Sequence, residues 1–278
     1  MSSIQSLLPN PVLRIIKNIY DGFRRLPELP DAYLHPWRRE SIRRLAALKD
    51  IHKGQRAIII GNGPSLNQTD LNKLKGEFTF GLNRIYLMFP QLGFSTTYLV
   101  SINDLVIEQC AQEMVALAIP KFFAWRSHRH FSSTLQLSNI PTFLYTSFTG
   151  PRFSHDVRGR VWEGATVTNV ALQLAFHMGF QKVILIGVDH NFTSKGEANK
   201  TVVSTGDDSN HFSGAYFGKG FRWQLPDLDT SEIGYAMARE HYQKAGREVI
   251  DATVGGKLTI FPKVDYDSLF KQDADEHR

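Results

Sequence analysis

The stretch AIIIGNGPSL at residues 57–66 joins an uninterrupted apolar run to a glycine-rich turn. An apolar run without polar alternation predicts a strand that is covered on both faces, as in parallel sheets with crossover helices. Gly61 and Gly63 permit close approaches of the backbone that a side chain would forbid. Pro64 suits an early helical position, where a missing N–H costs nothing. The stretch therefore predicts the first strand of an α/β sheet and a turn into a helix.

Short apolar runs and helical stretches alternate along the rest of the chain. This alternation predicts a doubly wound, mostly parallel sheet. We expect strands at 57–60, 78–82, 98–102, 121–125, 142–145, 183–186 and 248–250, and helices at about 69–75, 104–118, 166–178 and 231–245. Residues 191–229 lack periodicity and are rich in Gly, Asp and Asn, which is typical of a long functional loop.

The composition narrows the class of protein. Hydrophobic residues make up 42% of the 278 and charged residues 21%, so wholesale disorder is excluded. The single cysteine, Cys110, excludes a disulfide framework and a cysteine-based zinc or iron–sulfur site. No apolar run of about 18 residues is present, so we expect neither a transmembrane helix nor a signal peptide. These features predict a cytoplasmic protein.

The basic charge gathers at one end of the chain. Residues 1–56 hold 11 Lys and Arg against 5 Asp and Glu, whereas the remainder holds 21 against 22. This distribution disfavours a nucleic-acid channel across the body. Apolar residues recur at helical spacing within 11–26, beside basic ones. Such a helix fits either a peripheral contact with the inner face of the cell membrane or simple packing on the domain. We expect three parts: a basic helical extension (1–50), a nucleotide-binding catalytic domain (51–265) and a tail (266–278).

Polar side chains follow several predicted strands at the point where each strand ends. Asn62 and Ser65 follow the first strand, Asn83 the second and Asn103 the third. Because the carboxyl ends of parallel strands meet at one edge, a ligand in the crevice outside that edge would reach these residues. N–H groups of the 61–66 turn would attract a phosphate. Each asparagine also fits a turn or a helix cap, and Asp104 fits a cap.

Two further groups extend the candidate site. Asp189 follows the strand at 183–186, where its carboxylate fits a ribose or metal contact as well as a loop brace. In the long loop, His211 follows Asn210 in the run DDSNHF, and a histidine in such a loop is a candidate general base. A structural role is the alternative for each histidine. The chain contains no HExxH motif, CxxC pair or GxSxG elbow, and no metal site is expected.

The residues and motifs described above resemble those of a known group of proteins. GNGPSL is similar to the opening of Campylobacter-type bacterial sialyltransferases and of the 6-hydroxymethylpterin diphosphokinase MptE-like family, which includes the related domain of flagellin-modifying Maf proteins. The resemblance continues at Asn83, Asn103, RVWEG (160–164), IGVD (186–189) and SNHF (209–212), and covers about residues 56–220. It implies a Rossmann-like doubly wound α/β fold.

The sialyltransferase resemblance also implies residue roles. Asn62 and Ser65 would lie at the phosphates and donor sugar, together with the backbone of Gly61 and Gly63. Asn83 and Asn103 would bind the sugar or ribose, and Arg160 would lie near the sugar or acceptor. His211 would be the general base. The tyrosines that this group places after the strand ending in IGVD are missing here. Stabilisation of the leaving phosphate would then come from one of Tyr216, His190, Lys195 or Lys219.

Three functions remain open at this stage. The first is transfer of a sugar, with a CMP-linked nonulosonic acid as one candidate, from a nucleotide donor to a surface glycan or lipid-linked acceptor, with no metal or cofactor required. The second is pyrophosphoryl transfer from ATP to a pterin alcohol, with Mg²⁺ held by carboxylates such as Asp104, Asp189, Asp207 or Asp208. The third is a non-catalytic nucleotide-binding module.

Overall fold

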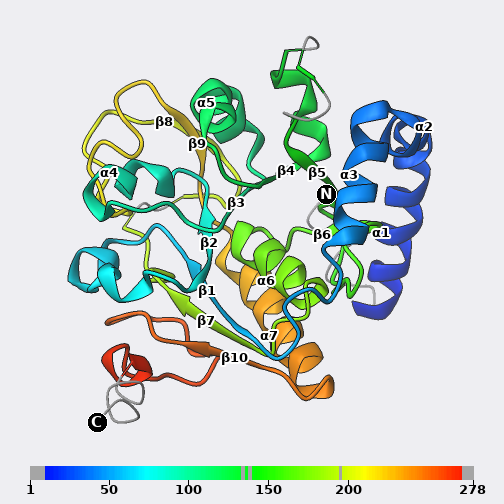
Figure 1. Cartoon of the computed structure of the whole chain (residues 1–278). Helices are drawn as coiled ribbons and strands as arrows, with labels where there is room; N and C mark the ends of the chain where they lie inside the picture. Colours follow the sequence, from blue (N-terminus) through cyan, green and yellow to red (C-terminus); the bar gives the residue numbers. More distant parts are fainter. Residues whose placement is uncertain (1–9, 133–134, 137–139, 194–195, 271–278) are drawn as a thin grey trace.

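One parallel sheet organises the chain, and the computed structural model describes residues 10–132, 135–136, 140–193 and 196–270 of it. Eight strands lie in the order β10-β7-β1-β2-β3-β4-β5-β6 (Figure 1). The strands are β1 (Arg56–Ile60), β2 (Phe78–Leu82), β3 (Tyr98–Ser101), β4 (Lys121–Ala124), β5 (Thr142–Ser147), β6 (Arg160–Trp162), β7 (Lys182–Ile186) and β10 (Glu248–Asp251). The strand order reverses beside β1, because β2 lies on one side of it and β7 on the other. The expected Rossmann-like doubly wound α/β fold is confirmed.

Helices cover both faces of this sheet. They are α1 (Asn10–Arg25), α2 (Leu29–Leu34), α3 (Pro36–Ala47), α4 (Phe89–Leu92), α5 (Asp104–Ala116), α6 (Val167–His177) and α7 (Leu228–Lys244). Ile59 of β1 packs in a cluster with residues of α6 and α7, whereas Ile58 packs in a second cluster with residues of α5. Both isoleucines are almost completely buried. Burial of each such side chain stabilises the fold by about 1.5–3 kcal/mol. Because helices cover both faces of the strand, apolar side chains are favourable on both of them.

The predicted helix at 69–75 is wrong. The chain there forms two short 3-10 helices, Pro64–Gln68 and Leu71–Leu74. The Asp70 carboxylate accepts a hydrogen bond from the Asn72 N–H (3.2 Å) and so begins the second one. Gly76, at a φ of 91°, follows shortly after. The Lys75 backbone is extended, with a ψ of 118°, so the helical turn ends there.

The segment 191–229 is not wholly irregular. It contains an antiparallel pair, β8 (Thr201–Val203) and β9 (Arg222–Gln224). Strands of three residues are too short to show a periodic pattern in the sequence, which is why they escaped prediction. β6 escaped for the same reason.

The amino-terminal helices approach the sheet at α3. The Phe143 N–H of β5 donates to Ser41 Oγ of α3 (2.9 Å), and Leu45 of α3 is fully buried in the core. At the other end of the chain, Tyr266 OH donates to the Asp70 carbonyl (2.8 Å) and so holds residues 266–270 against the body. None of the helices in the described part combines the length and apolar character that crossing a bilayer requires.

Candidate active site

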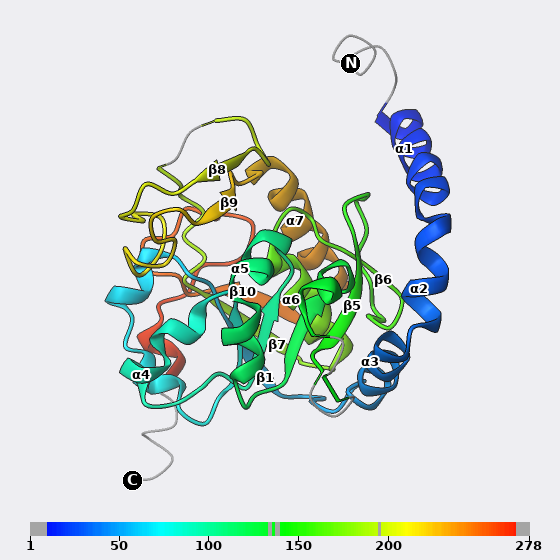
Figure 2. The ribbon, with the colours of Figure 1, turned by 90° about the horizontal axis from the view of Figure 1, so that it is seen from above.

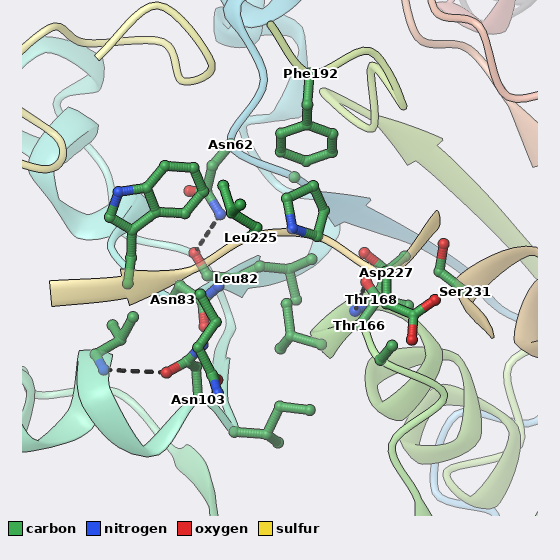
Figure 3. A pocket seen from close by; sticks show the side chains of 18 of the residues that line it. Asn62, Leu82, Asn83, Asn103, Thr166, Thr168, Phe192, Leu225, Asp227 and Ser231 are labelled. Carbon is green, nitrogen blue, oxygen red and sulfur yellow. Dashed lines mark hydrogen bonds between the residues drawn. The ribbon is translucent and has the colours of Figure 1, made fainter. Parts of the chain in front are cut away.

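A cavity of about 820 Å³ opens at the carboxyl ends of the strands. Its walls come from the turns after β1, β2 and β3, the start of α6, the turn after β7 and the segment that carries β8 and β9. Figure 3 shows Asn62, Asn83 and Asn103 on one side of this space and Thr166, Asp227 and Ser231 on the other. The cavity spans the position beside β1 where the strand order reverses, the usual ligand site of open α/β sheets.

The two glycines of the 61–66 turn allow it to approach the turn after β7. A Cβ at Gly61 would overlap the Gly187 carbonyl, and a Cβ at Gly63 would overlap the Asp189 carboxylate. The Gly63 N–H donates to the Gly187 carbonyl (2.9 Å). Both glycines line the cavity, but their lack of a side chain serves the close contact between two chain segments.

Ser65 binds the protein's own carboxylate. Its N–H donates to Asp189 Oδ1 (3.1 Å) and its hydroxyl donates to Asp189 Oδ2 (2.6 Å). Ser65 is buried and lies outside the cavity lining. The predicted contact of Ser65 with a donor phosphate therefore needs correction, because Asp189 occupies the position expected for the anion. The turn also enters a 3-10 helix rather than an α-helix.

The three asparagines do come together, as the parallel arrangement predicted. Asn62 Nδ2 donates to the Leu82 carbonyl (3.0 Å), while Asn62 Oδ1 is buried and finds no partner among the described residues. Asn83 Oδ1 accepts from the Ser101 hydroxyl (3.0 Å). Asn103 Oδ1 caps α5 by accepting from the Leu105 N–H (3.0 Å). Asn103 is therefore the cap that was expected at Asp104.

These bonds decide what the asparagines offer a ligand. Protein donors engage the amide oxygens of Asn83 and Asn103, so their Nδ2 groups remain as donors at the cavity wall. In Asn62 the two groups are reversed: its Nδ2 group is bonded to the protein, and its buried oxygen is the group that lacks a partner. Buried polar groups are almost always hydrogen-bonded, so an unpaired acceptor in a cavity wall favours a ligand with an N–H or O–H group there.

His211 and Asp208 form a hydrogen-bonded pair at the cavity. His211 Nδ1 lies 2.6 Å from Asp208 Oδ2, and the Asp208 side chain is only 5% exposed. A carboxylate only accepts hydrogen bonds, so Nδ1 carries the proton of the neutral ring and Nε2 carries the lone pair. The His211 ring lies flat on Tyr216, with ring centroids 4.0 Å apart. The pair therefore fixes both the tautomer and the ring orientation that a general base requires.

The segment that carries this pair is bound to the first turn of the sheet. The Phe212 N–H donates to the Asn62 carbonyl (2.8 Å), and Asn67 Nδ2 donates to the Phe212 carbonyl (2.9 Å). Asn210, also in the cavity wall, accepts from the Thr193 N–H through Oδ1 (2.8 Å). Asn210 Oδ1 thus braces the loop.

An ion pair in the cavity wall was missed by the sequence analysis. Arg126, directly after the strand segment predicted at 121–125, pairs with Glu163, which follows β6. Arg126 also donates to the Ile102 carbonyl (2.6 Å), and the ring of Phe148 lies 4.6 Å from its guanidinium. Both charged residues directly follow strand segments at the carboxyl edge. The rule that identified the three asparagines would therefore have found Arg126, whereas Glu163 follows β6, a strand that the sequence did not predict.

Arg160 is not among the residues that line the cavity. It is the first residue of β6 and lies at the amino end of that strand, whereas the cavity lies at the carboxyl ends. Of the groups considered for the leaving phosphate, His190 lines the cavity and Lys219 does not, while Lys195 lies outside the described residues. Tyr216 is fully buried beneath His211, and burial raises its pKa.

Of the carboxylates considered for Mg²⁺, Asp104, Asp189 and Asp208 are engaged by protein groups, and Asp207 is exposed and does not line the cavity. Asp104 binds Arg129, the Ser127 hydroxyl (2.8 Å) and His130 Nε2 (3.0 Å). Asp189 and Asp208 bind Ser65 and His211 as described. In the described part of the chain, no three His, Cys, Asp or Glu side chains gather as metal ligands. As placed, these side chains do not fit a preformed Mg²⁺ site.

The fold and the cavity define an α/β protein with a large site, lined by both polar and apolar side chains, at the reversal point of a parallel sheet. The model of the 6-hydroxymethylpterin diphosphokinase MptE-like family matches residues 38–195, so the chain belongs to this family. Membership indicates a transferase, of the diphosphokinase-like or the glycosyltransferase-like kind. The matched range includes the three asparagines and Asp189 but ends before His211. No curated protein matches the chain.

Proposed function

We propose that the protein is a glycosyltransferase that moves a sugar from a nucleotide-activated donor to a hydroxyl group, with His211 as general base. The pairing of His211, which lines the cavity, with the nearly buried Asp208 carries this proposal. Acceptors in keeping with it are surface glycans and lipid-linked sugars. A histidine held by a buried carboxylate is suited to accept a hydroxyl proton, and general base catalysis contributes about 10²–10⁴ in rate.

The cavity offers groups for a nucleoside. Trp223 lines it and packs against Phe217 with ring centroids 5.4 Å apart, which provides an aromatic surface for a base. Asn62 Oδ1 would accept from an exocyclic amino group or a ribose hydroxyl. The Nδ2 groups of Asn83 and Asn103 would donate to sugar or phosphate oxygens. Asp189 would support the turn through Ser65 rather than touch the ligand.

The charge of the lining favours a donor with a single phosphate. Arg126 is the one Lys or Arg side chain in the described lining, and Glu163 already neutralises it. A nucleoside diphosphate brings more negative charge into the same space, with no further cation from the protein to balance it. A neutral sugar linked to a nucleoside monophosphate makes the smaller demand, whereas the carboxylate of an activated nonulosonic acid brings that donor to about the same charge as a nucleoside diphosphate sugar.

The proposed step exchanges one C–O bond for another. The acceptor oxygen attacks the anomeric carbon and forms the new glycosidic bond, while the bond from that carbon to the phosphate oxygen breaks. Its electron pair leaves with the nucleotide phosphate, and the acceptor proton moves to His211 Nε2. The resulting imidazolium is stabilised by Asp208 through Nδ1–H. His190, which lines the cavity, is the remaining described candidate to stabilise the leaving phosphate.

Pyrophosphoryl transfer from ATP is the second candidate, supported by the description of the family. It would require Mg²⁺, and a non-catalytic nucleotide-binding module would require neither metal nor base. Thermal unfolding of the protein with CMP, CDP, UDP or ATP, each with Mg²⁺ or a chelator, separates the three. A ligand at 100 times its Kd stabilises the folded state by about 2.7 kcal/mol, enough to raise Tm visibly.

A rise with CMP that is independent of Mg²⁺ supports sugar transfer and directs a screen of CMP-sugars. A rise with ATP that needs Mg²⁺ contradicts it and directs the search to pterin alcohols. Binding of a nucleotide with no turnover of any donor would identify a binding module.

A further inference from the structure

One face of α1 gathers large apolar side chains at the surface of the molecule. At about 100° per residue, these side chains fall within an arc of about 140° around the helix. Each is between 40% and 69% exposed. They are Val12, Ile15, Ile16, Ile19, Tyr20 and Phe23. Monomeric proteins seldom expose a continuous apolar stripe of this kind, so it indicates an interaction surface.

The carboxyl end of α1 contacts the domain. Arg25, at the end of the helix, is buried, and its Nη1 donates to the Thr146 carbonyl (3.3 Å). Its guanidinium lies 5.2 Å from the ring centre of Tyr145. Arg25 is about 160° around the helix from Phe23, so the apolar stripe faces away from the sheet. Figure 2 shows α1 at the outer edge of the molecule, where it extends from α2 away from the sheet. The alternative that α1 packs its apolar side on the domain is therefore wrong.

The charge around the stripe decides what covers it. Apart from Arg25, which is buried against the domain, residues 10–25 contain three basic residues and one acidic residue, and the first turn of α1 holds no acidic side chain. A helix with an apolar stripe and basic flanks binds the interface of an anionic bilayer, where apolar burial and charge attraction act together. A second copy of the chain would instead bring like charges together. We propose that α1 docks on an anionic membrane surface, with the stripe at the boundary of headgroups and acyl chains. This inference is independent of the reaction proposed above.

Co-sedimentation of the full chain with vesicles tests this inference. The protein should bind phosphatidylcholine vesicles that contain phosphatidylglycerol, and bind less well to pure phosphatidylcholine or at high salt. The double variant Ile15→Glu/Ile19→Glu should lower the partition coefficient by about a hundredfold, about tenfold for each side chain. Ile233→Glu is the matched control, because Ile233 is 50% exposed on α7, and it should bind as the wild type does.

A measurement of Tm and a second variant show whether a loss of vesicle binding comes from the stripe or from misfolding. Because the stripe contributes little to the core, the double variant should keep the Tm of the wild type. The single variant Tyr20→Glu provides a milder change on the same face. Absence of binding to anionic vesicles overturns the proposal, as does an equal loss in the Ile233→Glu control. A wild-type dimer that the double variant converts to a monomer overturns it as well, because a second copy then covers the stripe.

Discussion

Ser65 and Asp189 are joined by two hydrogen bonds, although 124 positions separate them in the chain. Ser65 follows β1 and Asp189 follows β7, so the pair ties together the two turns on either side of the position where the strand order reverses. The turn that was expected to hold a phosphate instead holds a carboxylate of the protein itself. The floor of the cavity is thus fixed before any ligand arrives.

Replacing Ser65 by Ala should destabilise the fold. The change removes a donor from a carboxylate that is partly buried, and we expect the free energy of unfolding to fall by about 1–2 kcal/mol. Urea unfolding measures it. Ser268→Ala is the control, since that hydroxyl donates to the Asp265 carbonyl at the surface, and it should change stability by less than about 0.5 kcal/mol. Equal effects of the two changes would contradict a special role of the Ser65–Asp189 pair.

Gly63→Ala should destabilise the fold because the added methyl group overlaps the Asp189 carboxylate. We expect a loss of about 1–3 kcal/mol, typical of overpacking, together with weaker nucleotide binding as the turn moves. Gly218→Ala makes the same chemical change where no atom lies within 4 Å of the new Cβ, and it should be close to neutral. Thermal unfolding with and without nucleotide distinguishes the two. A neutral Gly63→Ala would show that the contact between the turns is loose.

His211→Ala should lower turnover by about 10²–10⁴ while leaving nucleotide binding largely intact. Asp208→Asn should lower kcat more than it raises KM, because an amide can donate to Nδ1 and thereby place the ring proton on the nitrogen that must act as base. His155→Gln, far from the cavity lining, is the control. Steady-state kinetics with the donor found in the nucleotide screen measure all three. Full activity of His211→Ala would remove the observation on which the proposed function rests.

The ion pair of Arg126 and Glu163 should show strong coupling. The Glu163 side chain is 5% exposed, so Arg126→Met leaves a buried carboxylate without its partner. We expect that change to cost about 2–3 kcal/mol of stability, less than for a fully buried pair because Arg126 is partly exposed. The double variant Arg126→Met/Glu163→Gln should recover part of this loss. A double-mutant cycle by urea unfolding provides the coupling energy, and simple additivity would contradict a direct interaction.

The pair of His155 and His241 should make stability depend on pH. His155 Nε2 lies 2.8 Å from His241 Nδ1, and burial together with this neighbour lowers the pKa of His241. The unfolded chain therefore binds more protons below the ordinary histidine value of about 6.5, and stability falls as pH decreases from there toward the lowered pKa. The drop in Tm between neutral and mildly acidic buffer should be smaller in His241→Gln than in the wild type. Identical slopes would exclude this pair as a source of the dependence.

Much of the fold could be predicted because its central strands are buried on both faces. Ile58 and Ile60 pack on one side of the sheet and Ile59 on the other, which leaves an unbroken apolar run in the sequence. The meeting of Asn62, Asn83 and Asn103 followed from parallel geometry alone. These successes depend on local pattern and strand direction, both of which are present in the sequence.

The remainder depends on contacts between distant residues. Nothing near Ser65 reveals that Asp189 will bind it, and nothing near Arg126 reveals Glu163 as its partner. The resemblance placed Arg160 near the sugar or acceptor. In the structure Arg160 begins the three-residue strand β6, so it lies at the end of that strand opposite to the cavity. The partner of a charged side chain depends on three-dimensional packing, which no spacing rule supplies.

The segment with Asp208 and His211 lies beyond the family match and rests on the first turn through Phe212. The scaffold that presents the asparagines and the segment that supplies the base are therefore separate parts of one cavity. Replacement of this one segment between β7 and α7 would change the reactive group, while the eight-stranded sheet would stay intact. A fold arranged in this way can acquire new chemistry without rebuilding its core.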